Sequence, residues 1–227
     1  MAFALDSLCA RRGVRMDIKA GELIRWLLGV AVISALTLSS IGCTSAPIKT
    51  YYKSGQLQTE MVSKSGERNG TIKNYYESGQ LQTEAVCENG KLNGVIKIYF
   101  ENGALKKEGV FKNNKLEGPV KDFFERGQLK KVSVYKNGVL EGPFKAYHEN
   151  GKLAETEVYK NGKLEGLFKF YYESGKLKGE GVYKDGKLEG LSKLYYENGQ
   201  LQTEGIFKNG EIEGQFKKYD ENGSLKQ

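Results

Sequence analysis

The sequence predicts an all-β protein, an elongated single-layer array of antiparallel β-hairpins. A motif repeats every 24 residues from Tyr51 to the C-terminus, glycine recurs at fixed places in it, and apolar and polar residues alternate between the glycines. Twenty-nine glycines against three prolines, with 14 tyrosines and 10 phenylalanines, favour strands joined by tight turns. Two turns per unit predict a meander of about fifteen strands.

The N-terminal 42 residues have the composition of an export signal. Residues 26–42 carry no charge and follow Arg25. This run is shorter than the roughly 20 residues that span a bilayer, and it ends in small residues. We therefore expect residues 1–42 to be a signal peptide, with Met16 as an alternative start. An uncleaved N-terminal anchor is the other interpretation.

The residues that follow this run predict a lipid anchor. Ser40-Ile41-Gly42-Cys43 resembles a bacterial lipobox, with Ser40 where leucine is usual. The resemblance implies that the Cys43 thiol receives a diacylglycerol and becomes the mature N-terminus. Residues 43–50 would then be the lipidated cysteine and a short linker. The expected location is extracytoplasmic, on the cell membrane or the outer membrane, with the membrane as a partner through the lipid. Cys87 would be the one remaining thiol, so no intramolecular disulfide is expected.

The charge pattern argues against a nucleic-acid partner. The formal net charge is +7, and setting aside residues 1–42, with five basic and three acidic residues, lowers it to +5. The remaining charges alternate in sign along the chain, whereas a nucleic-acid binder concentrates Lys and Arg on one surface. We interpret them as a solvated face.

The repeat occupies residues 51–227 without an insertion, which predicts one continuous domain of seven units and a partial eighth. The units begin at Tyr51, Tyr75, Tyr99, Phe123, Tyr147, Tyr171 and Tyr195, and the truncated one begins at Tyr219. A single unit buries too few side chains to offset the entropy of ordering its backbone, so neighbouring units must share their faces.

Three glycine positions recur in the units. The fifth position, in ENG or ESG, is expected to form a two-residue hairpin turn with positive φ, and includes Gly79 and Gly103. The sixteenth, in KNG, is glycine except at Asn114, and asparagine tolerates the same conformation. The twentieth, which includes Gly142, Gly166 and Gly190, lies within a strand where no turn explains it.

A two-residue turn sets a register that supplies a reason for the twentieth position. It pairs lysines with glutamates across the strands, a favourable arrangement. It also pairs the mid-strand glycines with aromatic residues, so we expect a ring to lie over each glycine. The pairs are Lys73–Glu84, Lys97–Glu108, Lys169–Glu180, Lys193–Glu204, Gly142–Tyr159, Gly166–Tyr183 and Gly190–Phe207.

Alternation then assigns two faces. The apolar face collects Tyr172, Leu177, Tyr183, Leu188 and Gly190, and the mixed face collects Glu180, Val182, Glu189, Lys193 and Tyr195. A column of tyrosines at the first position of the units suits an extended protein or polysaccharide partner, because tyrosine combines contact area with a polar tip. These candidate binding residues are Tyr75, Tyr99, Tyr147, Tyr171 and Tyr195. The alternative is that the column is packed within the sheet or simply solvated.

No residue pattern indicates catalysis, a metal site or a cofactor. His148, the only histidine, occupies a position held by Tyr or Phe in the other units, and Cys87 likewise replaces an aromatic residue. We interpret both as packing residues, since a lone histidine lacks partners for acid–base or metal chemistry. The protein is therefore not expected to be an enzyme. An envelope hydrolase would need an active site that these motifs do not supply.

At KNGKLEGLFKFYYESGKLKGEGVY, residues 160–183, the chain resembles the MORN-variant repeat of bacterial proteins labelled as the antitoxin component of the YwqK family. The resemblance covers residues 51–227 and implies a MORN-like solenoid. Standard MORN repeats carry a second glycine two residues beyond the mid-strand one, and here Phe168 and its equivalents occupy that position. We expect a non-catalytic lipoprotein that acts as a binding or scaffold module, and an antitoxin is the alternative.

Overall fold

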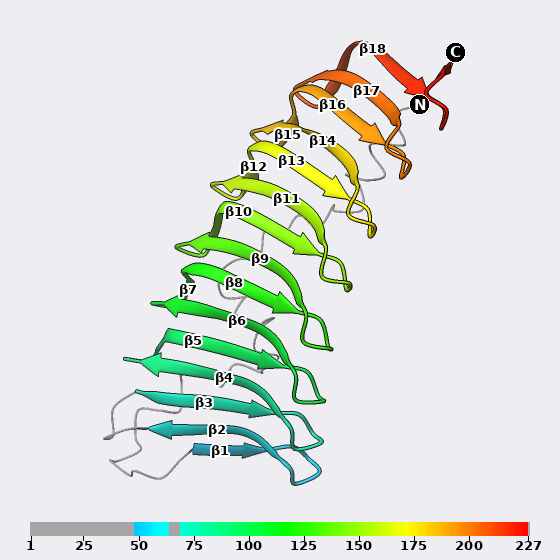
Figure 1. Cartoon of the computed structure of the whole chain (residues 1–227). Helices are drawn as coiled ribbons and strands as arrows, with labels where there is room; N and C mark the ends of the chain where they lie inside the picture. The colour runs from blue at the N-terminus through cyan, green and yellow to red at the C-terminus, as the bar shows by residue number, and fades with distance from the viewer. Residues whose placement is uncertain (1–47, 64–68, 227) are drawn as a thin grey trace. The chain divides into compact units, whose positions relative to one another are not determined.

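The computed structural model describes residues 48–63 and 69–226, and in this part of the chain a single antiparallel sheet of nineteen strands contains every regular element (Figure 1). The described residues include no helix that is long and apolar enough to cross a membrane. The strands are β1 (Ile48–Tyr51), β2 (Leu57–Ser63), β3 (Gly70–Tyr75), β4 (Leu81–Glu88), β5 (Lys91–Tyr99), β6 (Leu105–Lys112), β7 (Lys115–Leu116), β8 (Gly118–Phe123), β9 (Leu129–Lys136), β10 (Val139–Tyr147), β11 (Leu153–Lys160), β12 (Lys163–Leu164), β13 (Gly166–Tyr171), β14 (Leu177–Lys184), β15 (Lys187–Leu188), β16 (Gly190–Tyr195), β17 (Leu201–Lys208), β18 (Glu211–Tyr219) and β19 (Leu225–Lys226).

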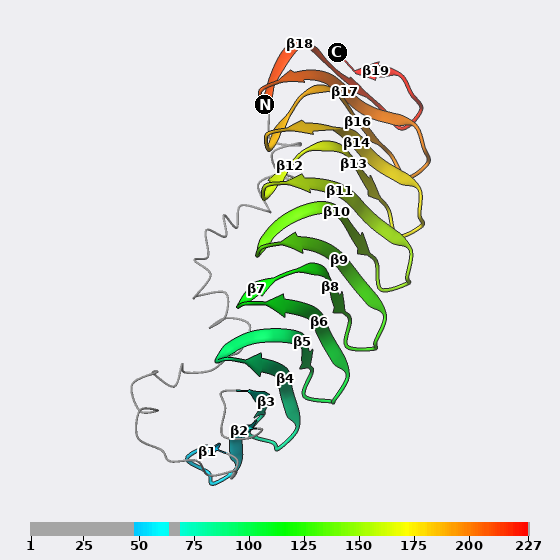
Figure 2. The same cartoon turned by 90° about the vertical axis from the view of Figure 1, so that its left-hand side faces the viewer.

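The predicted all-β hairpin array is confirmed. Each long strand pairs with the long strands before and after it in the chain, and the bent strands lie one after another along the sheet (Figure 2). The count exceeds the expected fifteen for two reasons. β1 lies mostly before the first unit, and three units have their second strand interrupted just before the mid-strand glycine, giving β7 and β8, β12 and β13, and β15 and β16.

The KNG sequences form two-residue turns. In the unit that starts at Tyr147, Lys160 pairs with Lys163 across Asn161 and Gly162, whose φ angles are 51° and 78°. Positive φ at both central residues is the type I′ geometry that matches the twist of a hairpin. Asn114, which replaces the glycine, adopts a φ of 65°, as expected of asparagine.

The ENG and ESG sequences form a different turn, and the predicted two-residue loop is wrong there. The Gly175 amide donates to the Tyr172 carbonyl at 2.8 Å, and the Tyr172 amide donates to the Lys176 carbonyl at 2.9 Å. Three residues therefore close the loop, with positive φ only at Gly175. This is the three-residue hairpin in which a type I turn is followed by a left-handed glycine.

A bulge next to this turn restores the predicted register. Tyr171 pairs with Leu177, whereas Phe170 pairs with Gly179, so Lys178 is an extra residue on its strand. Beyond the bulge, all four predicted Lys–Glu pairs and all three predicted glycine–aromatic pairs are confirmed.

The reason proposed for the mid-strand glycines is wrong, although their partners are correct. A Cβ on Gly166 or Gly190 would have no atom within 4 Å, and one on Gly142 would meet only Val134. Their φ angles are +86°, +75° and +104°. At Gly142 the strand also bulges, because Leu140 pairs with Tyr135 but Phe144 pairs with Ser133. These positions need glycine because the backbone enters the left-handed region where the strand bends.

Rings do lie over glycines, but at the eleventh position of the unit. A Cβ on Gly181 would lie 2.7 Å from Cε1 of Phe168, its partner in the register, and a Cβ on Gly205 would lie 2.7 Å from Cδ2 of Phe216. Phe168 is almost fully buried, and its ring centroid lies 4.9 Å from that of Tyr183. Here glycine provides room for a neighbouring side chain.

The core lies on the face that alternation assigned as apolar. Tyr183 and Leu188 are buried, while Tyr172, Leu177 and Gly190 are half-buried. The opposite face, which we call the outer face, carries Glu180, Lys193 and Tyr195 and their equivalents. The buried apolar residues run through most of the array and comprise Ala85, Cys87, Leu92, Ile96, Phe111, Leu116, Val120, Phe168, Tyr183, Leu188, Leu194 and Phe207.

Hydrogen bonds between units join the KNG turns into a column. The Gly162 amide donates to the Leu140 carbonyl at 2.9 Å, and the Asn161 amide donates to Oε2 of Glu141 at 2.6 Å. The amides of Asn137, Asp185 and Asn209 donate equivalent hydrogen bonds to carboxylates of the preceding unit. The acceptors are Glu117, Glu165 and Glu189, respectively. In these four units, the glutamate before the mid-strand glycine therefore binds the turn of the next unit.

Substitutions at the two kinds of glycine should destabilise the fold for different reasons. Gly166→Ala should lower the free energy of unfolding by about 1–2 kcal/mol through left-handed strain, and Gly166→Asn should lower it less. Gly181→Ala should cost about 1–3 kcal/mol by overpacking against Phe168. Adding Phe168→Leu should restore part of the loss in Gly181→Ala and none in Gly166→Ala, as measured by denaturant unfolding. Equal rescue of both would contradict this assignment.

Candidate functional site

The five candidate tyrosines lie at the ends of strands on the outer face, next to the ENG and ESG turns. All of them are half-buried. They end β3, β5, β10, β13 and β16, so equivalent side chains recur on every second strand, roughly 10 Å apart. The alternation places them with the Lys–Glu pairs.

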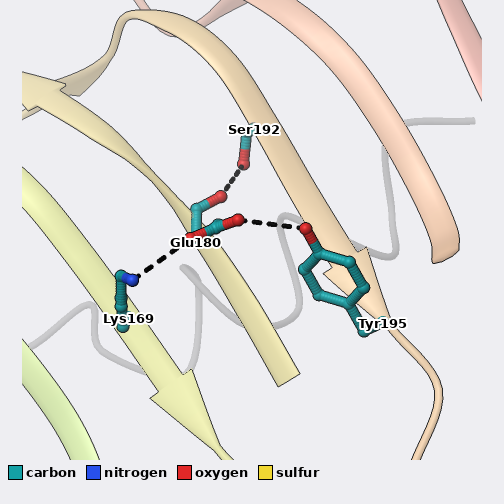
Figure 3. A network of polar contacts seen from close by, with 4 residues as sticks. All are labelled: Lys169, Glu180, Ser192 and Tyr195. Atoms are coloured by element: carbon teal, nitrogen blue, oxygen red, sulfur yellow. Dashed lines mark hydrogen bonds and ion pairs between the residues drawn. The ribbon is translucent and has the colours of Figure 1, made fainter. Parts of the chain in front are cut away.

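At Tyr195 a polar network holds the side chain (Figure 3). Its hydroxyl donates to Oε1 of Glu180 at 3.0 Å, and Lys169 Nζ lies 3.5 Å from Oε2 of the same carboxylate. The Ser192 hydroxyl donates to the backbone carbonyl of Glu180 at 3.3 Å. Burial is the main cause that raises the pKa of Tyr195 to about 12, and the hydrogen bond to Glu180 is the second. The phenol therefore stays neutral at physiological pH.

The same arrangement occurs at Tyr219 and Tyr75, which a glutamate also precedes by 15 residues. Tyr219 donates to Oε1 of Glu204 at 3.0 Å. This hydrogen bond, together with the ion pair to Lys217, lowers the pKa of the Glu204 carboxyl. Tyr75 donates to Oε2 of Glu60 at 3.4 Å.

Tyr147 and Tyr171 differ from these tyrosines. The residues 15 positions before them are Val132 and Thr156, so this place holds no carboxylate in either unit. The candidate column is therefore not uniform: Tyr75 and Tyr195 have hydroxyls bound to glutamates, whereas Tyr147 and Tyr171 lack that acceptor.

A second aromatic column joins successive units at the next residue. The Tyr172 hydroxyl donates to the Tyr195 carbonyl at 2.7 Å, and Tyr52, Tyr76 and Tyr196 make equivalent bonds. His148 takes part in this column, because its Nε2 lies 3.0 Å from the Tyr171 carbonyl and must donate to it. The packing interpretation of His148 agrees with this contact.

Cys87 lies among the core residues and is buried, with its strand partners Gly70 and Leu92 on either side. Burial raises the pKa of its thiol, which disfavours the reactive thiolate. This agrees with an apolar packing role.

Sequence reasoning missed a charged cluster on the core face in the middle of the array. Lys107 Nζ lies 3.1 Å from Oδ1 of Asp122, and Lys131 Nζ lies 3.7 Å from Oδ2. Further along, Glu155 and Glu157 are almost fully buried, with exposed fractions of 4% and 3%.

In the register, the two buried glutamates are not opposite lysines, unlike the glutamates of the predicted Lys–Glu pairs. Glu155 lies between Ala146 and Phe170 in the register, and Glu157 is opposite Phe144. The Tyr159 hydroxyl donates to Oε2 of Glu157 at 3.0 Å. A comparison of units could have found them, because other units carry Thr, Lys or Gly at the first of these positions and Met, Ala, Gly or Ser at the second.

These groups do not assemble an active site of a familiar kind. Among residues 48–63 and 69–226, no group of three or more His, Cys, Asp or Glu side chains could hold a metal ion. An open depression of about 440 Å³ lies between neighbouring ENG-type turns and is lined by Asn102, Phe124, Glu125, Arg126, Gln128 and Glu149. Cys43 and the predicted signal peptide lie outside the described residues.

The phenol of Tyr195 should affect stability in alkali. Because its pKa is raised from 10.0 to about 12, the folded protein holds this proton more tightly than the unfolded chain. Stability should therefore fall as the pH rises through this interval. Tyr195→Phe and Glu180→Gln should each reduce that fall, as followed by urea unfolding at a series of pH values. Identical pH dependence in wild type and Tyr195→Phe would rule the mechanism out.

Comparison with known families gives seven matches to one model, the MORN repeat variant. The matched residues are 68–86, 92–113, 116–137, 140–161, 164–185, 188–209 and 212–227, more than half of the chain. None of the curated proteins matches the sequence significantly.

Proposed function

Since the chain belongs to the MORN repeat variant family, a repeat-based binding or scaffold module, we propose that it is a non-catalytic lipoprotein of the cell envelope. The N-terminal segment supports the location. The apolar run at residues 26–42 ends at Gly42-Cys43, as a lipoprotein signal does. Only four residues separate Cys43 from Ile48, the first residue of β1, so a lipid on Cys43 would hold the array within about 20 Å of the membrane surface.

The partner surface that we propose is the tyrosine column of the outer face. Tyr147 and Tyr171 carry the argument, because their half-buried rings lie without the glutamate acceptor that binds Tyr195. Their phenols can therefore turn towards an incoming group. Equivalent rings roughly 10 Å apart suit an extended protein segment or a polysaccharide, which can contact several units at once.

An antitoxin is the alternative function, and it requires a different location. It would neutralise a cytoplasmic toxin, so it requires a chain that starts after the apolar run. The envelope hydrolase has no support from the arrangement of side chains described above. The lipid on Cys43 is therefore the decisive property to measure.

Cells that express the wild type should incorporate labelled fatty acid into the protein, whereas Cys43→Ala should abolish the label. Cys87→Ala is the matched control, since its thiol is buried and should leave labelling unchanged. Membrane fractionation of the same strains should release the Cys43→Ala protein from the membrane. Equal labelling of all three proteins, or none in the wild type, would contradict the lipoprotein and favour a cytoplasmic function.

The tyrosine surface can be tested by photo-crosslinking in intact cells. A crosslinker at Tyr147 or Tyr171 should yield one discrete product, and the same group at exposed Lys187 in the KNG column should not. Tyr171→Ser should reduce the product formed from position 147 several-fold, with an unchanged melting temperature. The same product from Lys187, or an undiminished product in Tyr171→Ser, would make these tyrosines structural.

A further inference from the structure

A row of apolar side chains runs along the outer face at the other end of the strands from the tyrosines. It consists of the twelfth and twenty-first residues of the units, from Val62 on β2 to Ile206 on β17, and we call it the outer stripe. The register joins its members across neighbouring strands as Val95–Val110, Leu167–Val182 and Leu191–Ile206. Thr71 is the only member of the stripe with a polar side chain. Pro119 and Pro143 occupy the twenty-first position in two units. The stripe is therefore continuous over thirteen strands.

The stripe is exposed to solvent in the described part of the chain. The exposed fraction is 64% at Leu167 and 50% at both Leu191 and Ile206. Valine is common on exposed strands because β-branched residues suit them, but leucine has no such preference. Strand propensity therefore does not explain Leu167 and Leu191. Contiguous apolar rows of this kind mark interaction surfaces, whereas single exposed residues do not.

Charged rows flank the stripe on both sides. The row beside the KNG turns is mainly lysine, with strand pairs such as Lys160–Lys163 and Lys184–Lys187, and the signs of the other row restrict the partner. On the side towards the tyrosines, the ladder includes the ion pairs Lys121–Glu108 at 3.0 Å, Lys169–Glu180 at 3.5 Å and Lys217–Glu204 at 3.3 Å. Lys145 has Thr156 and Val132 as its strand partners, whereas every other lysine of the ladder has a glutamate beside it. The two signs therefore nearly balance, and the ladder attracts neither an acidic partner nor an anionic lipid surface strongly. A surface with the same alternation of signs can instead place its lysines opposite these glutamates.

The length of the stripe also restricts the partner. Thirteen strands about 4.8 Å apart extend for about 60 Å, and with one charged row on each side the surface is on the order of 1,000 Å². Stable interfaces bury about 800 Å² per partner, so this area suffices. A partner that packs along the whole length must present apolar groups with the same period. A second copy of this chain has that period and the same alternating ladder.

We propose that the outer stripe is the surface through which two copies of this chain associate face to face. The two sheets pack as in a β-sandwich, with the apolar rows between them and the Lys–Glu ladders at the rim. This association does not depend on the lipid or on the tyrosine column.

The test compares Leu167→Lys/Leu191→Lys with Val139→Lys in the full-length protein. Val139 is a matched control because it is exposed to a similar extent, at 46%, but lies beside a KNG turn outside the stripe. Density-matched sedimentation equilibrium in mild detergent gives the dissociation constant. Co-purification of two differently tagged copies from cells gives the same comparison in the membrane. Leu167→Thr/Leu191→Thr keeps good strand formers in place, so its circular dichroism should match that of the wild type.

Wild type and Val139→Lys should form dimers and co-purify, and both double variants should weaken association at least ten-fold while remaining folded. A wild type that is monomeric in both measurements would overturn the proposal. Equally strong association of the folded Leu167→Thr/Leu191→Thr variant and of Val139→Lys would also overturn it. If the Lys double variant unfolds, the Thr double variant alone decides between these outcomes.

Discussion

Hydrogen bonding between equivalent turns of successive units is the interaction on which this structure depends. The amide of each KNG turn binds a carbonyl of the preceding unit, as Gly162 binds Leu140, and the glutamate of that unit binds the neighbouring amide. At the other end of the strands, aromatic hydroxyls such as that of Tyr172 bind the carbonyl of the next unit. Both sets of bonds require turns of identical shape at a constant spacing. The 24-residue period is thus a physical requirement, and an insertion in one unit would break the bonds of two.

This constraint also determines what the surfaces can carry. Because the register is constant, each position of the unit reaches the same face and the same distance from the turns. Positions that contact the next unit hold aromatic residues, and His148, which replaces tyrosine at one of them, lies within hydrogen-bond distance of the same carbonyl. Positions that point outward between the turns are less restricted. The tyrosine column and the outer stripe are built from such positions, and they lie at opposite ends of the strands.

The interior shows where the repeat departs from its own pattern. Lys107, Asp122 and Lys131 form ion pairs on the core face, and Glu155 and Glu157 are buried a few strands away. Buried carboxylates are costly to desolvate, so their presence at these two positions in one unit alone is a local exception to the repeat. The backbone of the array is therefore regular, whereas the core-face side chains of its central units differ from those of the other units.

The hairpin array, the register beyond each bulge and the two faces could be predicted from the sequence, because these depend on period and alternation. The packing roles of His148 and Cys87 could also be predicted, since other units show what their positions hold. The spacing of residues did not reveal the form of the ESG turn or the roles of the strand glycines, and these became clear only in the folded structure. The ESG turn has three residues, and a compensating bulge at Lys178 hides this from a count of residues. Gly166 and Gly181 look alike in sequence, yet one provides a left-handed backbone and the other provides room for Phe168. The physical reason is that a repeat specifies which residues meet, whereas φ and the distance between a Cβ and a ring depend on how the bent strands pack.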